Sequence, residues 1–417
     1  NGTKVGLVTS GTMVPYWKFE GEGATMSITE EHDRRAVALA YIDAQIPSQQ
    51  ELEVEVRGRR LDSQLVLWHG RSEAPPYFRA IPLNNKPETQ RSSSAVSGEN
   101  VSLLLKKSLE NHEWRQQNCI NLIPSEMTQS SLVRLLQITD PCGRYAEHKE
   151  LLAAFEQQVF YYQGTEFIEW VEDRLVEEMR EFLGCPLVES RMISGQMANM
   201  TVFSAMVDYR NRTERRSEPA RLPLVMNNHI GKGGHLSSQP MGALRDYVAK
   251  NPITEKYAVI NFPVLKDDPY CIDLQETAAL LETYDPELII LGKSMILYPE
   301  PVEAISKMLE AKSVRPVLMY DMAHVIGLIG SHFQDPFSEG ADIITGSTHK
   351  TLFGSQRGII GAAYEEETPE YELWQAIQRR AFPGAVSNHH LGTLLGMLMA
   401  SLEMNAFKES YQPQVLA

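Results

Sequence analysis

The sequence predicts an α/β domain with a mostly parallel sheet, preceded by a small all-β barrel domain. From about residue 101 onward, amphipathic helical segments alternate with short apolar strands. Before residue 84 the segments are short, mostly β-branched or alternating, and separated by glycine, proline and polar turns. Alternation of helices and strands is typical of a parallel sheet covered by helices. A chain of 417 residues also has room for more than one domain.

Residues 1–83 are predicted to form the small β-barrel. The expected strands are GLVTS, AVALAYI, ELEVEVRG and LDSQLVLW, and no long helical period occurs between them. Residues 84–100 follow as NNKPETQRSSSAVSGEN, which is almost free of apolar side chains. Such a segment cannot bury enough surface to offset its ordering entropy, so it is predicted to be a linker.

Residues 101–417 are predicted to form the α/β domain. Helical periodicity marks residues 101–117, 167–184 and 301–312. Apolar runs of strand length occupy residues 222–227, 257–262, 287–292, 315–321 and 341–347. Binding sites in sheets of this kind lie at the carboxyl ends of the strands.

Composition narrows the classes of function. The chain has 39 Lys and Arg against 54 Asp and Glu, a formal net charge of −15, which disfavours nucleic acid as a partner. No apolar run approaches the roughly 20 residues of a membrane helix, and no signal pattern opens the chain. The four cysteines, Cys119, Cys142, Cys185 and Cys271, form no CxxC pair. We therefore expect no metal site and a reducing, cytoplasmic location.

Three polar residues follow predicted strands. Asp321 ends VLMYD, His324 comes three residues later, and Lys350 closes ADIITGSTHK. Taken singly, an aspartate after a strand is often a helix cap and a lysine there is usually a solvated charge. However, residues 347–349, which lead into Lys350, are too small and polar for a core. The three residues together indicate a site at the ends of the strands.

Six sequence blocks resemble the serine hydroxymethyltransferase family. YDMAHVIGL and GSTHKTLFGSQRG are similar to its DMAH and THKT blocks. The blocks RYAEH, FYYQGTEFIEWVE, SGQMANM and GGHLS match the family in the same order. The resemblance implies the fold-type I large domain of enzymes that depend on pyridoxal 5'-phosphate (PLP).

The resemblance implies a set of cofactor contacts. Lys350 would form the imine with PLP, because an amine among apolar and cationic groups loses its proton readily. Asp321 would keep the pyridine nitrogen protonated, which makes the ring an electron sink. The amides of a helix N-terminus would bind the phosphate, His235 would stack on the ring, and His324 would bond its phenolic oxygen. The implied cofactor-binding residues are Ser194, Gly195, Gln196, His235, Asp321, His324, Thr348, His349 and Lys350.

The resemblance also implies catalytic groups beside Lys350. Glu147 matches the family's acid/base carboxylate, and Tyr145 and Tyr162 match its two site tyrosines. Glu147 or His235 would handle the hydroxyl proton of the substrate. In the family, Tyr145, Glu147 and Tyr162 would reach the site from the neighbouring subunit. The resemblance therefore implies a homodimer with shared active sites.

The implied reaction makes or breaks the Cα–Cβ bond of a β-hydroxy amino acid, serine or threonine. The acceptor is either tetrahydrofolate as co-substrate or an aldehyde, as in a threonine transaldolase or aldolase. Three departures favour the transaldolase branch: residues 385–393 (AVSNHHLGT) replace a glycine-rich segment, Phe353 replaces an arginine, and residues 292–297 (GKSMIL) replace a Ser-x-Tyr-Pro segment. A non-catalytic PLP-fold scaffold is a third possibility, against which the intact Lys350, Asp321 and His324 argue.

The two ends of the sequence carry further expectations. VGLVTSGTMVPYWK, RRAVALAYID and ELEVEVRGRRL resemble the C-terminal β-domain of the glycine cleavage T protein, an aminomethyltransferase. That protein's folate-binding core has no counterpart in this sequence, so the β-domain is expected to have an accessory or interaction role. At YQPQVLA the family continues into a small C-terminal domain with an arginine for the substrate carboxylate. We expect that domain to be missing, which leaves Arg357 and Arg379 as candidates for the carboxylate.

Overall fold

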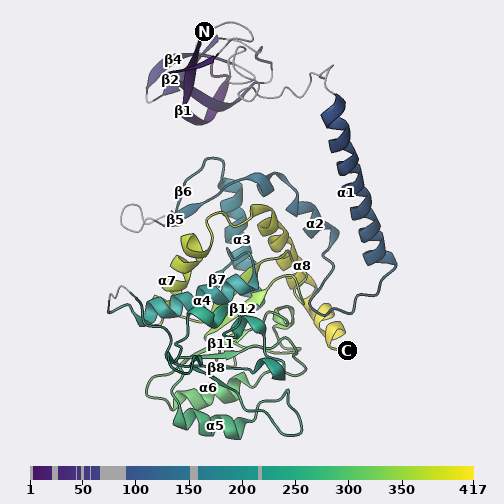
Figure 1. The fold of residues 1–417 in the computed structure, drawn as a ribbon, viewed down its shortest axis with the longest axis vertical. Coiled ribbons are helices and arrows are strands. Elements are labelled where there is room, and N and C mark those ends of the chain that lie inside the picture. Colours follow the sequence, from purple (N-terminus) through teal and green to yellow (C-terminus); the bar gives the residue numbers. More distant parts are fainter. Residues whose placement is uncertain are drawn as a thin grey trace. The chain divides into compact units, whose positions relative to one another are not determined.

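The computed structural model describes most of the chain as two compact units, Asn1–Ile120 and Asn121–Ala417 (Figure 1). The described residues are 3–20, 27–43, 45–47, 51–56, 58–65, 91–150, 158–214 and 218–417. None of the helices among them is long and apolar enough to cross a membrane.

The first unit is rich in β-structure, as predicted. Strands β1 (Gly6–Glu20) and β2 (Ser27–Ile42) form one antiparallel pair, and β3 (Glu51–Val56) and β4 (Arg59–Gln64) form another. Among the described residues these pairs are separate two-stranded sheets, so the closed barrel stays a prediction. Residues 66–83 of the predicted β-domain lie outside the described residues.

Helix α1 (Arg91–Gln117) begins inside the segment predicted to be a linker. Residues 91–100 are therefore helical, and residues 84–90 lie outside the described residues. The prediction rested on the shortage of apolar side chains, which argues against burial but not against helical hydrogen bonding within the segment. Residues 98–114 are all exposed. The domain boundaries near 83 and 101 remain predictions.

The second unit is built on a seven-stranded sheet in the order β7-β13-β12-β11-β10-β8-β9. Strand β13 runs antiparallel to both neighbours, whereas the other pairings are parallel. The strands are β7 (Leu187–Glu189), β8 (Val225–Asn227), β9 (Val259–Asn261), β10 (Leu288–Leu291), β11 (Val317–Asp321), β12 (Ile343–Ser347) and β13 (Gly358–Ala362). The mostly parallel sheet of the sequence analysis is confirmed.

Helices pack on both faces of this sheet. On β11, Leu318 and Tyr320 belong to one apolar cluster with α3, α5, α6 and α8, whereas Met319 belongs to a second cluster with α4 and α7. The helices are α2 (Ser131–Gln137), α3 (Glu166–Leu183), α4 (Gly195–Arg210), α5 (Leu274–Thr283), α6 (Val302–Glu310), α7 (Tyr371–Arg379) and α8 (Leu391–Leu416). Alternate side chains of a strand face opposite sides, so the sheet separates two cores.

Shorter elements complete the unit. A small antiparallel pair is formed by β5 (His148–Glu150) and β6 (Gln158–Phe160). The 3-10 turns are η3 (Asp140–Gly143), η4 (Ile230–Lys232), η5 (Leu236–Ser238), η6 (Ala243–Asp246) and η7 (Ile326–Leu328), and η8 (Arg380–Ala385) is a π-helical turn. Of these, η5 lies directly after His235 and η7 soon after His324, so both belong to the region where the strands end.

Candidate active site

The carboxyl ends of β11 and β12 bring the predicted residues together. The two strands are parallel neighbours, and Asp321 at the end of β11 is in register with Thr345 of β12. Lys350 follows three residues after β12 ends, and His324 follows three residues after β11 ends. The site is therefore at the edge of the sheet where a parallel α/β fold places its ligands.

Asp321 is a buried carboxylate held by three donors. Its Oδ2 atom lies 2.5 Å from Nδ1 of His235 and accepts a hydrogen bond of 2.8 Å from Nδ2 of Asn199. Its Oδ1 atom accepts a bond of 3.1 Å from the amide of Ala323. Burial alone would raise the pKa of Asp321, but the attraction of His235 and these hydrogen bonds outweigh it and lower the pKa. The carboxylate is thus kept ionised inside the protein.

Asn199 on α4 orients this carboxylate. Its Oδ1 accepts a bond of 2.5 Å from Thr345 Oγ1, and its Nδ2 also donates to Ser237 Oγ at 2.6 Å. The Thr345 bond fixes which end of the amide faces Asp321. Asn199, Thr345 and Ser237 were not among the residues predicted from the sequence. The available signal was an asparagine inside SGQMANM, a helical segment that is otherwise suited to burial.

Lys350 lies beside His324, which in turn contacts His235. Its Nζ is 3.2 Å from Nε2 of His324, whose ring meets that of His235 edge-on with 5.2 Å between centroids. Burial lowers the pKa of Lys350, and the charge of Asp321 opposes this effect. Burial, together with the charges of Lys350 and His235, lowers the pKa of His324 to about 4. His324 is therefore neutral near pH 7 and can accept a hydrogen bond from the lysine.

The first turn of α4 contains the residues that are predicted to bind the phosphate. Ser194 is the N-cap, and its hydroxyl accepts the amide hydrogen of Met197 at 3.1 Å. A Cβ atom on Gly195 would lie 2.3 Å from Ser347 Oγ, so the backbone of Gly195 approaches the end of β12 closely. Gln196 is exposed. The helix N-terminus therefore lies directly against the end of the strand that leads to Lys350.

Thr348 and His349 differ in their roles. Thr348 Oγ1 donates to the carbonyl of Ser355 at 2.7 Å and accepts the amide of Arg357 at 3.1 Å, so it holds the loop around Lys350 together. His349 has a buried Nδ1 atom with no hydrogen-bond partner among the described residues. Burial, reinforced by the charge of Lys350, lowers the pKa of His349. An unpaired buried nitrogen next to Lys350 is a polar group open to a ligand.

Tyr145, Glu147 and Tyr162 form a second, separate cluster. Tyr162 donates its hydroxyl to Glu147 Oε2 at 3.3 Å, and the two tyrosine rings lie 5.5 Å apart. Tyr145 and Tyr162 are 54% and 44% exposed. Within the described part of this chain, no hydrogen bond, ion pair or ring contact joins these three residues to Lys350 or Asp321.

The position of Glu147 is fixed by the residue that follows it. His148 is buried, with its ring stacked on Phe160 at 4.6 Å between centroids. Its Nε2 atom lies 3.5 Å from a carboxylate oxygen of Glu172 on α3. This anchor, which the sequence analysis did not identify, leaves Glu147 half-buried and its neighbour Tyr145 exposed.

Arg357 and Arg379 do not serve the strand-end site as they stand. Arg357 is 0% exposed, and its guanidinium donates to the carbonyls of Ser190, His389 and His390 and to Thr393 Oγ1. Its role in the structure is to tie the segment after η8 to the sheet. Arg379 lines an open hollow of about 390 Å³ between the C-terminal end of α4 and α7.

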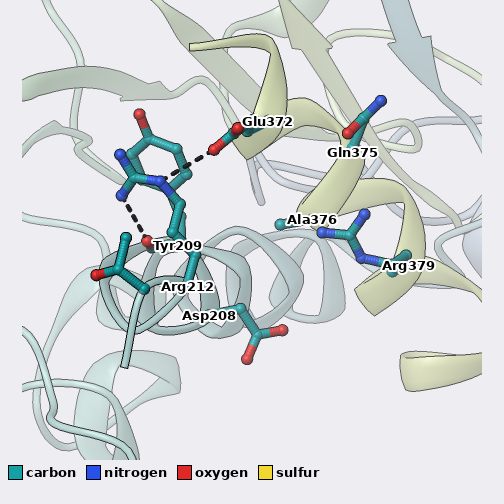
Figure 2. A pocket seen from close by; sticks show the side chains of 8 residues that line it. Asp208, Tyr209, Arg212, Glu372, Gln375, Ala376 and Arg379 are labelled. Carbon is teal, nitrogen blue, oxygen red and sulfur yellow. Dashed lines mark hydrogen bonds and ion pairs between the residues drawn. The ribbon is translucent and has the colours of Figure 1, made fainter. Parts of the chain in front are cut away.

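Figure 2 shows this hollow, whose other charged groups are mostly paired. Arg212 lies over the ring of Tyr209 and pairs with Glu372 at 3.0 Å, and Asp208 pairs with Arg380. The hollow adjoins the end of α4 opposite to Ser194. It is therefore not the candidate active site.

The neutral state of His324 predicts a dependence of stability on pH. A histidine whose pKa is lowered by folding stabilises the folded state at pH values above its ordinary pKa of 6.5. This stabilisation is lost as the pH falls toward the folded-state pKa of about 4. His324→Asn should therefore lose less stability than the parent protein between pH 7 and pH 5. We expect a difference of roughly 1 kcal/mol, since solvent screens a half-buried ring.

Denaturant unfolding of the cofactor-free protein at the two pH values measures this difference. The exposed His112 on α1 offers the matched control, His112→Asn. If His324→Asn and the parent protein lose the same amount of stability between pH 7 and pH 5, then His324 takes up its proton in the folded protein as readily as in the unfolded chain.

Comparison with known proteins identifies the family of the chain. The family model described as serine hydroxymethyltransferase matches residues 100–417. Serine hydroxymethyltransferase of Archaeoglobus fulgidus is 34% identical over 309 residues, which cover 74% of this chain and 62% of that protein. The enzyme of Pyrobaculum aerophilum is 34% identical over 317 residues, 76% of this chain and 66% of that protein. This chain thus spans slightly less than two thirds of these relatives.

Among solved structures, L-threonine transaldolase from Pseudomonas fluorescens, in its internal aldimine state, is similar in fold. The TM-score is 0.63 with 23% sequence identity, and the match covers 78% of this chain and 67% of that one. The family match begins at residue 100. The resemblance of residues 1–83 to the glycine cleavage T protein therefore stays a prediction.

Proposed function

The chain belongs to the serine hydroxymethyltransferase family, and we propose that it is a PLP-dependent enzyme that makes or breaks the Cα–Cβ bond of a β-hydroxy amino acid. The observation that carries this proposal is the buried, ionised Asp321 beside His235, with Lys350 and a neutral His324 at the ends of adjacent parallel strands. Paired groups with shifted pKa values at a strand-end site are typical of catalytic machinery.

The residues present fit PLP. The buried Nδ1 atom of His349 has no partner among the described residues and is available to a ligand. The first turn of α4 lies against Ser347, so its backbone amides are available at the end of the strand that leads to Lys350. Lys350 would hold the cofactor covalently, Asp321 would meet its pyridine nitrogen, and the amides after Ser194 would bind its phosphate. When bound, PLP supplies an electron sink for a negative charge on the substrate's α-carbon.

The protein's own groups each have a defined task. Asn199 and His235 hold the Asp321 carboxylate ionised and oriented, so that it can keep a neighbouring basic nitrogen protonated. Lys350 has a lowered pKa and therefore gives up its proton more readily than an exposed lysine. His324, being neutral, can donate or accept a hydrogen bond without adding charge to the site. We propose Glu147 or His235 as the group that moves the proton of the substrate hydroxyl.

The acceptor is the open part of this proposal. Tetrahydrofolate and an aldehyde are the two candidates. Phe353 is one of the departures from the family pattern, and its ring packs edge-on against Tyr411 of α8 with 5.1 Å between centroids. An aromatic packing contact thus stands where the family pattern has a cation. This supports the transaldolase alternative as the second candidate function.

A product assay tests the proposal and separates the two acceptors. The PLP-loaded protein is given L-serine or L-threonine, with and without tetrahydrofolate, and glycine formation is measured. Folate-stimulated glycine formation from L-serine supports hydroxymethyl transfer. Folate-independent cleavage of L-threonine, increased by an added aldehyde, supports the transaldolase. No glycine from either amino acid under any condition would refute both and leave the scaffold alternative.

We further propose that the enzyme acts as a homodimer with shared sites. In the second unit, large apolar side chains are exposed within the stretch of sequence that also contains the Tyr145 cluster; they include Leu122, Leu132, Leu135, Ile138, Tyr161, Phe167 and Trp170. Exposed apolar surface of this extent is typical of an interface. A second copy covering it would explain why Tyr145, Glu147 and Tyr162 lie apart from Lys350 within one chain.

Mixed dimers test the shared site. Subunits carrying Glu147→Gln are mixed with subunits carrying Lys350→Ala and refolded together. Each heterodimer should contain one site in which both defects are absent, and so should recover about half of the parent activity. If the heterodimers are as inactive as the two single variants, then Glu147 and Lys350 of one subunit belong to the same site.

Two broader assignments complete the proposal. All four cysteines are free, which supports a reducing compartment such as the cytoplasm. We assign the β-rich first unit an accessory or interaction role, on the basis of its resemblance to the C-terminal β-domain of the glycine cleavage T protein.

A further inference from the structure

A buried ion pair lies close to the candidate active site, and the proposed reaction does not use it. Lys293 Nζ is 2.6 Å from Glu300 Oε1, and each side chain is only 3% exposed. Lys293 belongs to the GKSMIL segment, which departs from the family pattern, and Glu300 comes shortly before α6. Removing two charges from water costs about as much as their attraction returns, so such a pair is poor evidence of stability alone. The contacts of the two side chains indicate its role better than its contribution to stability does.

Both partners are fixed by further hydrogen bonds. Lys293 Nζ also donates to the carbonyl of Tyr270 at 2.6 Å. The backbone of Glu300 is held by Gln334, which accepts from its amide at 3.1 Å and donates to its carbonyl at 2.6 Å. The Oε2 atom of Glu300 is buried without a partner among the described residues. The ammonium group of Lys293 is therefore held between the Glu300 carboxylate and the Tyr270 carbonyl.

The segment that contains Lys293 is joined to the loop that carries His235. Gly292 accepts the amide hydrogen of His235 at 2.9 Å and donates its own amide to Asn228 Oδ1 at 2.8 Å. Ser294 donates its amide to the carbonyl of Gly233 at 2.8 Å. Two backbone hydrogen bonds, one on each side of Lys293, thus attach the histidine loop to this segment.

The same segment also abuts Asp321. A Cβ atom on Gly292 would lie 2.8 Å from Cβ of Asp321, so the segment has no room to move toward the carboxylate. His235, whose amide bonds Gly292, places its Nδ1 atom 2.5 Å from Asp321 Oδ2. A displacement of residues 292–294 would therefore change the His235–Asp321 contact directly.

We propose that Lys293 is a positioning residue, which sets the contact between His235 and Asp321 by anchoring residues 292–294 to Glu300 and Tyr270. The proposal rests on the proposed function, in which Asp321 and His235 bind the cofactor. The GKSMIL segment, which departs from the family pattern, would thus hold the His235 loop against Asp321.

The test compares variants that separate stability from positioning. Lys293→Met leaves Glu300 as an unpaired buried carboxylate and should lower the melting temperature strongly. The double variant Lys293→Met/Glu300→Gln removes both charges and should recover most of that loss. The control is Lys307→Met, which removes the lysine of the exposed Glu303–Lys307 pair on α6.

The decisive readout is the ring of His235, observed by NMR in ¹⁵N-histidine-labelled protein without cofactor. In the double variant its nitrogen resonances should move toward those of a histidine without a carboxylate partner, and the dissociation constant of PLP should rise about tenfold or more. Lys307→Met should match the parent protein in both measurements. A double variant with parent-like His235 resonances and PLP affinity would overturn the proposal and make the pair purely structural.

A second variant covers the case in which the double variant does not fold. Glu300→Asp keeps both charges but draws Lys293 toward a carboxylate that is one methylene shorter, and it should shift the His235 resonances in the same direction. Unchanged resonances in Glu300→Asp would likewise overturn the proposal. If the resonances shift as expected but the parent protein binds no PLP, the positioning role stands and the proposed function fails.

Discussion

Lys350→Ala should abolish amino-acid turnover and remove the visible absorbance of the protein–cofactor complex. Lys350 is the lysine at the strand-end site, beside His324, and its lowered pKa makes its nitrogen available for a covalent link to the cofactor. The nearby Lys293 is held in a buried ion pair and cannot replace it without leaving Glu300 unpaired. We expect the variant to fold, because Lys350 takes part in no ion pair with the residues that the structure describes and its loop is held by Thr348.

Absorbance spectra and glycine formation from L-serine and L-threonine measure this effect. Lys307→Ala, which removes an exposed lysine of α6, is the matched control and should resemble the parent protein. Substantial turnover by Lys350→Ala would contradict the assignment of this lysine.

Asp321→Asn should reduce turnover by about 10³-fold or more, although the cofactor should still bind through the amides after Ser194. The substitution keeps the volume but removes the negative charge that would hold the pyridine nitrogen protonated. Loss of that charge costs several kcal/mol of transition-state stabilisation. The amides after Ser194, which we propose as the phosphate site, are unaffected, and an asparagine oxygen can still accept from Asn199.

Steady-state kinetics and a cofactor titration of the same preparation measure the two effects separately. Asp285→Asn removes an exposed carboxylate that pairs with Lys312 and serves as the control for loss of an aspartate. An Asp321→Asn variant with near-normal turnover would show that the charge at this position is not needed for the reaction.

The core strands were predictable because a buried parallel strand reads as a short continuous apolar run. Strands β8 and β10 to β12 all fall within the expected ranges, and Asp321 and Lys350 could be placed from their positions relative to those strand ends. The hairpin of β1 and β2 is much longer than the two expected segments. Gly11 and Pro15 indicate turns, but both are paired across this two-stranded ribbon, where an edge position tolerates proline.

Other parts of the site could not be predicted from local sequence. Asn199 and Thr345 are single polar residues inside apolar elements, and their importance depends on partners more than a hundred residues away. Glu147 was identified by resemblance alone, since a glutamate before a short strand otherwise suggests a surface charge. The anchoring role of Lys293 depends on contacts with Tyr270 and Glu300 that no local pattern specifies.

The most direct test of the account is to locate the covalent attachment of the cofactor in the unaltered protein. The PLP-loaded protein is reduced with borohydride, digested and analysed by mass spectrometry. The account predicts that the added mass of the reduced cofactor is found on the peptide containing Lys350 and on no other lysine peptide. Attachment to a different lysine, or no attachment at all, would contradict the assignment of the strand-end site as the cofactor site.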